Sequence, residues 1–235
     1  MNKNVLIAGA SRGLGYSLTY QYLKSGFTVF AGVRNIKCEK LGILKTQFKD
    51  KLIVIQMDVA SSQSVKKAAE QVKLYCNKLD IVINSAGIHS EDSFEVLENV
   101  DLDNAIEVYN VNSIGVMRVA KEFLGLLQNG DDKVLLNISS ESGSIGSCQR
   151  YKEFDYCMSK AAVNMASVLL QNYLKERKIK VLAVQPGWMR TDMGGDSADI
   201  DPVEAAECIF NLAEKNKHNL EAPVFVDRHG EILPW

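Results

Sequence analysis

Residues 4–15 read NVLIAGASRGLG, and this stretch decides the fold that we expect. A short apolar run ends at a turn that holds Gly9, Gly13 and Gly15, and a helical pattern over Leu14–Ser25 follows at once. Bare glycines let a phosphate approach the free N–H groups of a helix N-terminus, where the helix dipole favours anions. The spacing is G-x-x-x-G-x-G rather than the general G-x-G-x-x-G. Because tight turns also use glycine for backbone reasons, the turn alone leaves both interpretations open.

Short apolar runs rich in β-branched residues alternate with longer helical patterns along the chain. This alternation is typical of repeated βα units, whose parallel strands are covered by helices on both faces. The predicted strands are Asn4–Ala8, Thr28–Gly32, Leu52–Met57, Ile81–Asn84, Lys133–Ile138, Lys180–Val184 and Val224–Val226. The predicted helices are Leu14–Ser25, Ser62–Tyr75, a long one within Asp101–Gln128, Asp155–Arg177 and Pro202–Asn216. We expect one Rossmann-type α/β domain over residues 1–235, with a doubly wound, mainly parallel, seven-stranded sheet and helices on both faces.

The composition argues against several classes of function. The 27 Lys and Arg residues nearly balance the 29 Asp and Glu residues and form no basic block, so we expect neither nucleic-acid nor membrane partners. The five cysteines and three histidines are scattered without the spacing of a metal site, so we expect reduced thiols and no metal. The first apolar run is too short for a signal peptide, and no later run approaches the roughly 18 residues of a membrane span. We therefore expect a cytoplasmic protein.

The end of the second predicted strand bears on the choice of cofactor. NAD-specific sites usually place an acidic side chain here to bind the ribose hydroxyls, whereas arginine suits a 2′-phosphate. No acid lies in residues 28–37, and both Arg34 and Arg12 could reach such a phosphate. Exposed arginines are also common at strand ends, so NADP(H) is favoured and NAD(H) is the alternative.

A tyrosine and a lysine lie four residues apart where the helix Asp155–Arg177 begins. Tyr156 and Lys160 should share one helix face, and a neighbouring cation favours the phenolate, which brings the tyrosine pKa toward the range of proton transfer. Ser140, at the end of the fifth predicted strand, supplies a hydroxyl that could hold a substrate oxygen. Ser139 is the competing hydroxyl, but it should point to the opposite face of the strand. Neither the pair nor the serine is specific by itself.

Together these features resemble the short-chain dehydrogenase/reductase family. The glycine turn is followed, in the order and approximate spacing of that family, by Asp58-Val59, Asn84-Ser85-Ala86-Gly87, Asn112, Ser140, Tyr156-x-x-x-Lys160 and Pro186-Gly187. The resemblance covers essentially the whole chain. Within the family, residues 140–146, 156–165, 185–195 and 227–235 are similar to the C-factor and Sniffer-like carbonyl reductase branch.

The resemblance implies an NADPH-dependent carbonyl reductase that transfers hydride from the nicotinamide to an aldehyde, ketone or quinone. Tyr156 would be the general acid, and Lys160 would lower its pKa and hold the nicotinamide ribose. Ser140 would bind the substrate oxygen, and Asn112 would keep a water in a proton relay behind Lys160. The residues that would bind the cofactor are Gly9, Ser11, Arg12, Gly13, Leu14, Gly15, Arg34, Asp58, Val59, Asn84, Ala86, Gly87, Tyr156, Lys160, Pro186, Gly187, Thr191 and Met193.

The sequence departs from the family pattern without losing a reacting group. Ala8 stands where the family usually has Thr, and Ser85 replaces the usual second Asn of the fourth-strand motif. Ser140 and Tyr156 are sixteen residues apart, longer than the common spacing. Residues 147–153 should therefore form an extra excursion beside the active site.

Substrate specificity should lie in three loops, 88–100, 143–153 and 187–200. In the third loop, Trp188, Met189 and Met193 could form an apolar lid over a small-molecule carbonyl or alcohol substrate, or could simply pack on the domain. The apolar surfaces of the two long helices imply, by the resemblance, a homodimer or homotetramer. The alternative function is a C-factor-like signalling or regulatory protein with incidental turnover. The complete set of Asn112, Ser140, Tyr156 and Lys160 favours the enzyme.

Overall fold

The computed structural model describes residues 3–235. Seven strands form one sheet in the order β3-β2-β1-β4-β5-β6-β7, and every neighbouring pair is parallel. The strands are β1 (Asn4–Ala8), β2 (Thr28–Val33), β3 (Leu52–Gln56), β4 (Ile81–Asn84), β5 (Val134–Ile138), β6 (Lys180–Gln185) and β7 (Phe225–Asp227). The predicted seven-stranded parallel sheet is confirmed, with each strand within a residue or so of its expected place.

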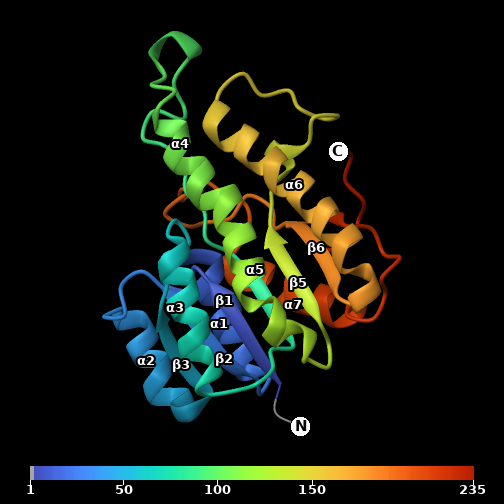
Figure 1. Ribbon diagram of the computed structural model, residues 1–235. Helices are drawn as coiled ribbons and strands as arrows, with labels where there is room; N and C mark the ends of the chain where they lie inside the picture. Colours follow the sequence, from blue (N-terminus) through green and yellow to red (C-terminus); the bar gives the residue numbers. More distant parts are fainter. Residues whose placement is uncertain (1–2) are drawn as a thin grey trace.

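Helices cover both faces of this sheet (Figure 1). The helices α1, α2 and α7 pack on one face, and α3, α5 and α6 pack on the other. The helices are α1 (Gly13–Lys24), α2 (Glu39–Phe48), α3 (Ser62–Lys73), α4 (Asn104–Tyr109), α5 (Gly115–Gln128), α6 (Phe154–Leu174) and α7 (Pro202–Asn216). Right-handed crossovers between parallel strands place the helices in two layers, one on each face of the sheet.

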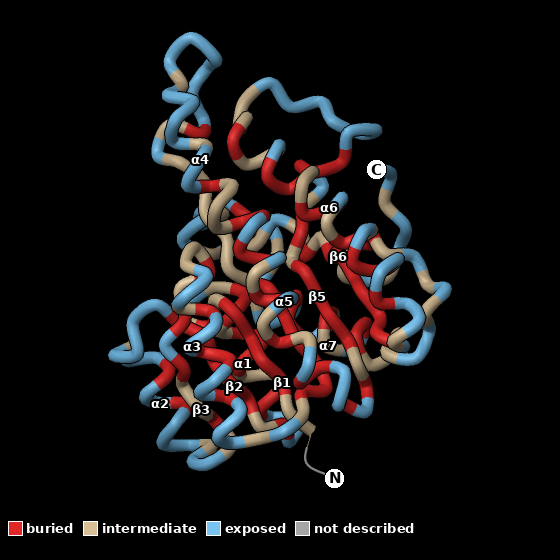
Figure 2. The backbone as a smooth tube through the Cα atoms, in the orientation of Figure 1, coloured by how far each residue is buried: buried red, intermediate tan, exposed pale blue. Residues whose placement is uncertain are grey.

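The core lies in two layers, one on each side of the sheet. Successive side chains of a strand point to opposite faces, so Val5 and Ile7 of β1 enter one layer while Leu6 enters the other. All three are fully buried, and the strands run as buried segments through the centre of the molecule (Figure 2). Each such side chain contributes about 1.5–3 kcal/mol when it is removed from water, which explains why these strands are almost wholly apolar.

Two local features of the helices were not named from the sequence. The helix α2 was not predicted, because only Leu41 and Leu44 of its ten residues are buried and its apolar periodicity is correspondingly faint. The N-cap of α3 is Ser61, whose side chain accepts a hydrogen bond from Ser64 N.

The long helix expected within residues 101–128 contains a π-helical segment, Asn110–Ile114, between α4 and α5. A π turn adds one residue to a helical turn and breaks the regular backbone hydrogen bonding, and such turns occur often at functional sites. This one contains Asn112, which the sequence singled out. None of the helices within residues 3–235 combines the length and apolar character that crossing a bilayer requires.

Candidate active site

A cavity of about 670 Å³ opens at the carboxyl edge of the sheet. The strands β1 and β4 are neighbours there, although their connections run to opposite sides of the sheet. The loops that follow such a topological switch point diverge and leave a crevice, which is where open α/β sheets bind ligands. The loops 88–100 (green) and 143–153 (yellow) rise above the same edge in Figure 1.

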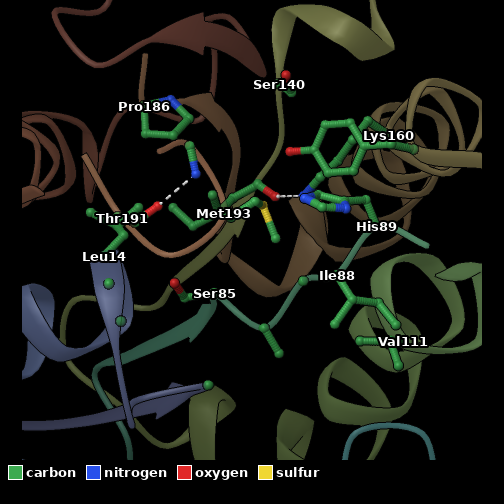
Figure 3. A pocket seen from close by; sticks show the side chains of 18 of the residues that line it. Leu14, Ser85, Ile88, His89, Val111, Ser140, Lys160, Pro186, Thr191 and Met193 are labelled. Atoms are coloured by element: carbon green, nitrogen blue, oxygen red, sulfur yellow. Dashed lines mark hydrogen bonds between the residues drawn. The ribbon is translucent and has the colours of Figure 1, made fainter. Parts of the chain in front are cut away.

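The cavity gathers nearly all of the predicted site residues, although they come from both ends of the chain. Those that line it are Gly9, Ser11, Arg12, Gly13, Leu14, Gly15, Arg34, Asp58, Val59, Ala86, Gly87, Ser140, Tyr156, Lys160, Pro186, Gly187, Thr191 and Met193. Figure 3 shows Leu14 and Thr191 on one side of this space and Lys160 with His89 on the other. The predicted residues Asn84 and Asn112 do not line it.

The side-chain amides of Asn84 and Asn112 are both hydrogen-bonded to other groups of the protein. Asn84 is paired with Asn137 across β4 and β5, and its Nδ2 donates to Asn137 Oδ1 over 2.8 Å within the buried sheet. Asn112 Oδ1 accepts from Ile88 N at 2.8 Å, while its Nδ2 donates to Ile88 O at 2.8 Å and to Ser159 Oγ at 3.0 Å. Asn112 therefore fixes the start of loop 88–100 to the π turn. Its expected part in a water relay stays a prediction.

The three glycines of the glycine-rich turn leave out a side chain for two different reasons. A Cβ at Gly15 would lie 2.0 Å from Gly9 O, and a Cβ at Gly9, whose φ is +88°, would lie 2.6 Å from Ala86 N. These two glycines permit close contacts within the protein. Gly13, with a φ of +51°, is different, because its Cβ would meet the side chain of Thr191, with Cγ2 at 3.3 Å, and both residues line the cavity.

Replacement of Gly15 by alanine is expected to destabilise the protein by about 3 kcal/mol, because the new methyl group meets a backbone oxygen that cannot move aside. The matched control is Gly125→Ala in α5, where no atom lies within 4 Å of the added Cβ. That control should gain about 0.5–1 kcal/mol from helix propensity. Urea unfolding of both variants measures the difference, and equal midpoints would show that the turn does not require Gly15 for packing.

The N-terminus of α1 is suited to an anion. Within residues 3–235, no side chain caps its first turn, and that turn contains no acidic residue. Its free N–H groups and dipole therefore face the cavity without a protein partner. The bare turn, this helix end and the nearby Arg34 fit the pyrophosphate and phosphate groups of a dinucleotide.

Arg12 and Arg34 are not equivalent. Arg34 is exposed at the cavity wall, next to the end of β2. Arg12 Nη1 instead lies 2.9 Å from Asp192 Oδ2, which joins the glycine-rich turn to the loop after β6. A 2′-phosphate would thus have to compete with Asp192 for Arg12, and Arg34 is the arginine that is ready to receive it. The sequence could not show this because the two partners are 180 residues apart.

Tyr156 and Lys160 lie together on the first turns of α6. Lys160 Nζ is 5.4 Å from the centre of the Tyr156 ring and donates to Ile138 O at 2.8 Å, the bond drawn in Figure 3. Burial lowers the pKa of Lys160 to about 8. Burial also raises the pKa of Tyr156 to about 12, and the lowering by the Ser140 hydroxyl does not offset it. Desolvation thus decides the direction of the Tyr156 pKa in this structure, and the lowering expected from the sequence is not seen.

The structure separates the two candidate serines by their partners. Ser139 is buried, and its Oγ donates to Asn164 Oδ1 at 2.5 Å, so its hydroxyl is committed to the helix behind it. Ser140 Oγ donates to Ser142 Oγ at 3.1 Å, and the Ser140 hydroxyl lowers the pKa of Tyr156. Ser140 is therefore the hydroxyl that shares the cavity with the phenol, which agrees with the strand alternation used to choose it.

Several residues that line the substrate side of the cavity were not singled out from the sequence as individual residues. His89 and Phe94 of loop 88–100 pack edge-to-face with ring centres 5.2 Å apart. Arg150 of loop 143–153 is held by Glu141 and Glu153. Only the position of His89, Phe94 and Arg150 in these loops pointed to them, because their contacts depend on loop shape. Trp188, which the sequence offered as part of an apolar lid, stays 54% exposed, and its indole N–H donates to Gly194 O at 2.8 Å.

The family model of the short chain dehydrogenases matches residues 3–200 of this chain. The chain belongs to the short-chain dehydrogenase family. The family resemblance seen in the sequence is therefore confirmed, and the chain is an oxidoreductase. Among residues 3–235, no group of three or more His, Cys, Asp or Glu side chains is placed to hold a metal ion.

Relatives of this family member include short-chain dehydrogenase/reductase atnB of Arthrinium sp., which is 31% identical over 233 residues, or 94% of this chain and 86% of that protein. Estradiol 17-beta-dehydrogenase 2 of Mus musculus is 31% identical over 209 residues, 86% of this chain. The match spans only 52% of that longer protein.

Solved structures of carbonyl reductases have the same fold. The NADPH-bound carbonyl reductase from chicken fatty liver superposes with a TM-score of 0.87 at 28% identity, covering 100% of this chain and 94% of that one. The carbonyl reductase of Pseudomonas aeruginosa PAO1 in complex with NADP gives a TM-score of 0.81 at 28% identity, with both chains fully covered. The carbonyl reductase Sniffer of D. melanogaster, at 24% identity and a TM-score of 0.88 over 100% of both chains, shares the fold.

Proposed function

We propose that this protein is an NADPH-dependent carbonyl reductase that reduces an aldehyde, ketone or quinone. The observation that carries the proposal is the meeting of Ser140, Tyr156 and Lys160 in one cavity whose other end is a bare, uncapped helix N-terminus. The two carbonyl reductases at 28% identity, one described with NADPH and one with NADP, support the same chemistry. The test is oxidation of NADPH, with NADH in parallel, in the presence of aldehydes, ketones, quinones and dicarbonyls.

In this mechanism the protein orients the carbonyl and supplies a proton. When bound, the nicotinamide supplies the hydride that reduces the carbonyl carbon. The Ser140 hydroxyl donates to the carbonyl oxygen, and Tyr156 transfers its phenolic proton to that oxygen as negative charge develops. Because burial keeps the pKa of Tyr156 at about 12, the phenol is protonated at neutral pH and ready to act as the acid. Lys160 is close enough to stabilise the phenolate that remains.

The substrate loops, the oligomeric state and the location are further proposals. The loops 88–100, 143–153 and 187–200 of this one domain select the substrate, since all three contribute to the cavity wall. We also propose a homodimer or homotetramer, because α4 to α6 expose Ile106, Ile114, Met165 and Leu169, each about half exposed or more. The cytoplasmic location expected from the sequence stays a proposal.

The cofactor preference provides a direct test of Arg34. We expect Arg34→Ala to weaken NADPH binding by about 10- to 100-fold, because a charge-assisted hydrogen bond to the 2′-phosphate is lost. Binding of NADH, which lacks that phosphate, should change by less than about twofold. The control is Lys37→Ala, an exposed cation three residues away that does not line the cavity. Fluorescence titration measures both affinities, and an equal loss for NADPH and NADH would mean that Arg34 does not read the phosphate.

A further inference from the structure

Loop 88–100 is tied to the catalytic helix through one buried carboxylate. Asp155 lies in the first turn of α6 and is 3% exposed. Its Oδ2 accepts from Ser90 N at 2.8 Å, and its Oδ1 accepts from Ser93 Oγ at 2.6 Å. A backbone bond of 2.7 Å from Glu153 N to Ser93 O joins the same two segments. The loop before α4 and the beginning of α6 lie side by side in Figure 1.

Asp155 is well suited to hold this loop as an anion. Burial alone would raise the pKa of its carboxyl, but hydrogen bonds from Ser93 and Ser90 outweigh burial and hold the pKa below its usual value. The first turn of α6 also favours a negative charge through the helix dipole. A carboxylate that accepts at both oxygens fixes its donors more strongly than a neutral group would.

The loop is thereby fixed at two points on either side of a residue that lines the cavity. Asn112 holds both backbone groups of Ile88, and Asp155 holds Ser90 and Ser93. His89 lies between these points and projects into the cavity near Lys160 (Figure 3). Phe94, the next residue after Ser93, packs against the His89 ring.

We propose that Asp155 is a positioning residue, which holds the His89–Phe94 wall of the substrate pocket at a fixed distance from the neighbouring Tyr156. This inference rests on the proposed carbonyl reductase function. Asp155 does not touch the reacting atoms. It sets the shape of the wall against which the larger part of a carbonyl substrate packs.

The test is Asp155→Asn, which keeps the volume but turns an NH2 group toward one of the two donors. We expect KM for a bulky aromatic ketone to rise about tenfold or more, since a hydrogen bond to a buried charged group is lost. KM for a small aldehyde, which does not reach the wall, should change by less than about twofold, and kcat and NADPH affinity should stay within about twofold. The control is Glu91→Gln, an exposed change in the same loop.

Hydrogen exchange separates this inference from the proposed function. In Asp155→Asn the amides of residues 88–100 should exchange at least about tenfold faster, with α1 unchanged, whether or not a carbonyl is turned over. Ser93→Ala, which removes only one donor, should give a smaller effect in the same loop. Unchanged exchange, or an equal rise in KM for the bulky and the small substrate, would overturn the positioning role. Absence of turnover in the wild type with faster exchange in the variant would reject only the reductase proposal.

Discussion

Replacement of Tyr156 by phenylalanine is expected to lower kcat for carbonyl reduction by about 10²- to 10⁴-fold, the range contributed by a positioned general acid. The phenolic hydroxyl is the only group removed, and the aromatic ring beside Lys160 remains. NADPH affinity should therefore change by less than about threefold. Loss of turnover with cofactor binding kept would identify the phenol as the proton donor.

The pH dependence of the wild type follows from the same phenol. A donor with a pKa of about 12 is protonated below that pH, so reduction should show no loss from ionisation of Tyr156 between pH 6 and about 9. The matched control is Tyr151→Phe, a 77% exposed tyrosine outside the cavity lining, which should keep full activity. Wild-type protein that binds NADPH but turns over no carbonyl of the panel would favour the C-factor-like signalling alternative.

The sheet could be predicted because its signal is local and repeated. The strand β1 places Val5 and Ile7 in one layer and Leu6 in the other, so every position must be apolar, and the same holds for the other central strands. The helix α2 escaped prediction because it lies at the sheet edge and buries only two side chains. Where burial is slight, the sequence is free to be polar and its periodicity fades.

Only the site residues that belong to the family motifs could be predicted from the sequence. The sequence could not show side-chain partners far apart along the chain, such as Asn137 for the amide of Asn84 and Asp192 for the guanidinium of Arg12. The pKa of Tyr156 is a further case, because the i, i+4 spacing to Lys160 predicts proximity but not how far both groups are buried. Asp155 carries no motif at all, and only its contacts with Ser90 and Ser93 reveal it.

Replacement of Lys160 by methionine is expected to reduce activity by about 100-fold while making the protein more stable at neutral pH. Burial lowers the pKa of Lys160 from its usual 10.5 to about 8, which means that folding penalises the charged form. The difference corresponds to roughly 3 kcal/mol at about 1.4 kcal/mol per pKa unit. Loss of the hydrogen bond to Ile138 O offsets about 1 kcal/mol of the gain. A net stabilisation of about 2 kcal/mol follows, measured by urea unfolding at pH 7.

The sign of this effect can be checked by raising the pH. Between pH 8 and 10.5 the unfolded chain holds a proton on Lys160 that the folded protein has released, so the free energy of unfolding of the wild type rises with pH from this group. Lys160→Met lacks that contribution, and its advantage should shrink as the pH approaches 10.5. Lys40→Met, a change at an exposed position of α2, is the control for the replacement of a lysine by methionine. An advantage of Lys160→Met that stays constant from pH 7 to 10.5 would mean that the cost of this lysine comes from packing. A decline with pH would show that the buried charge of Lys160 itself destabilises the folded protein.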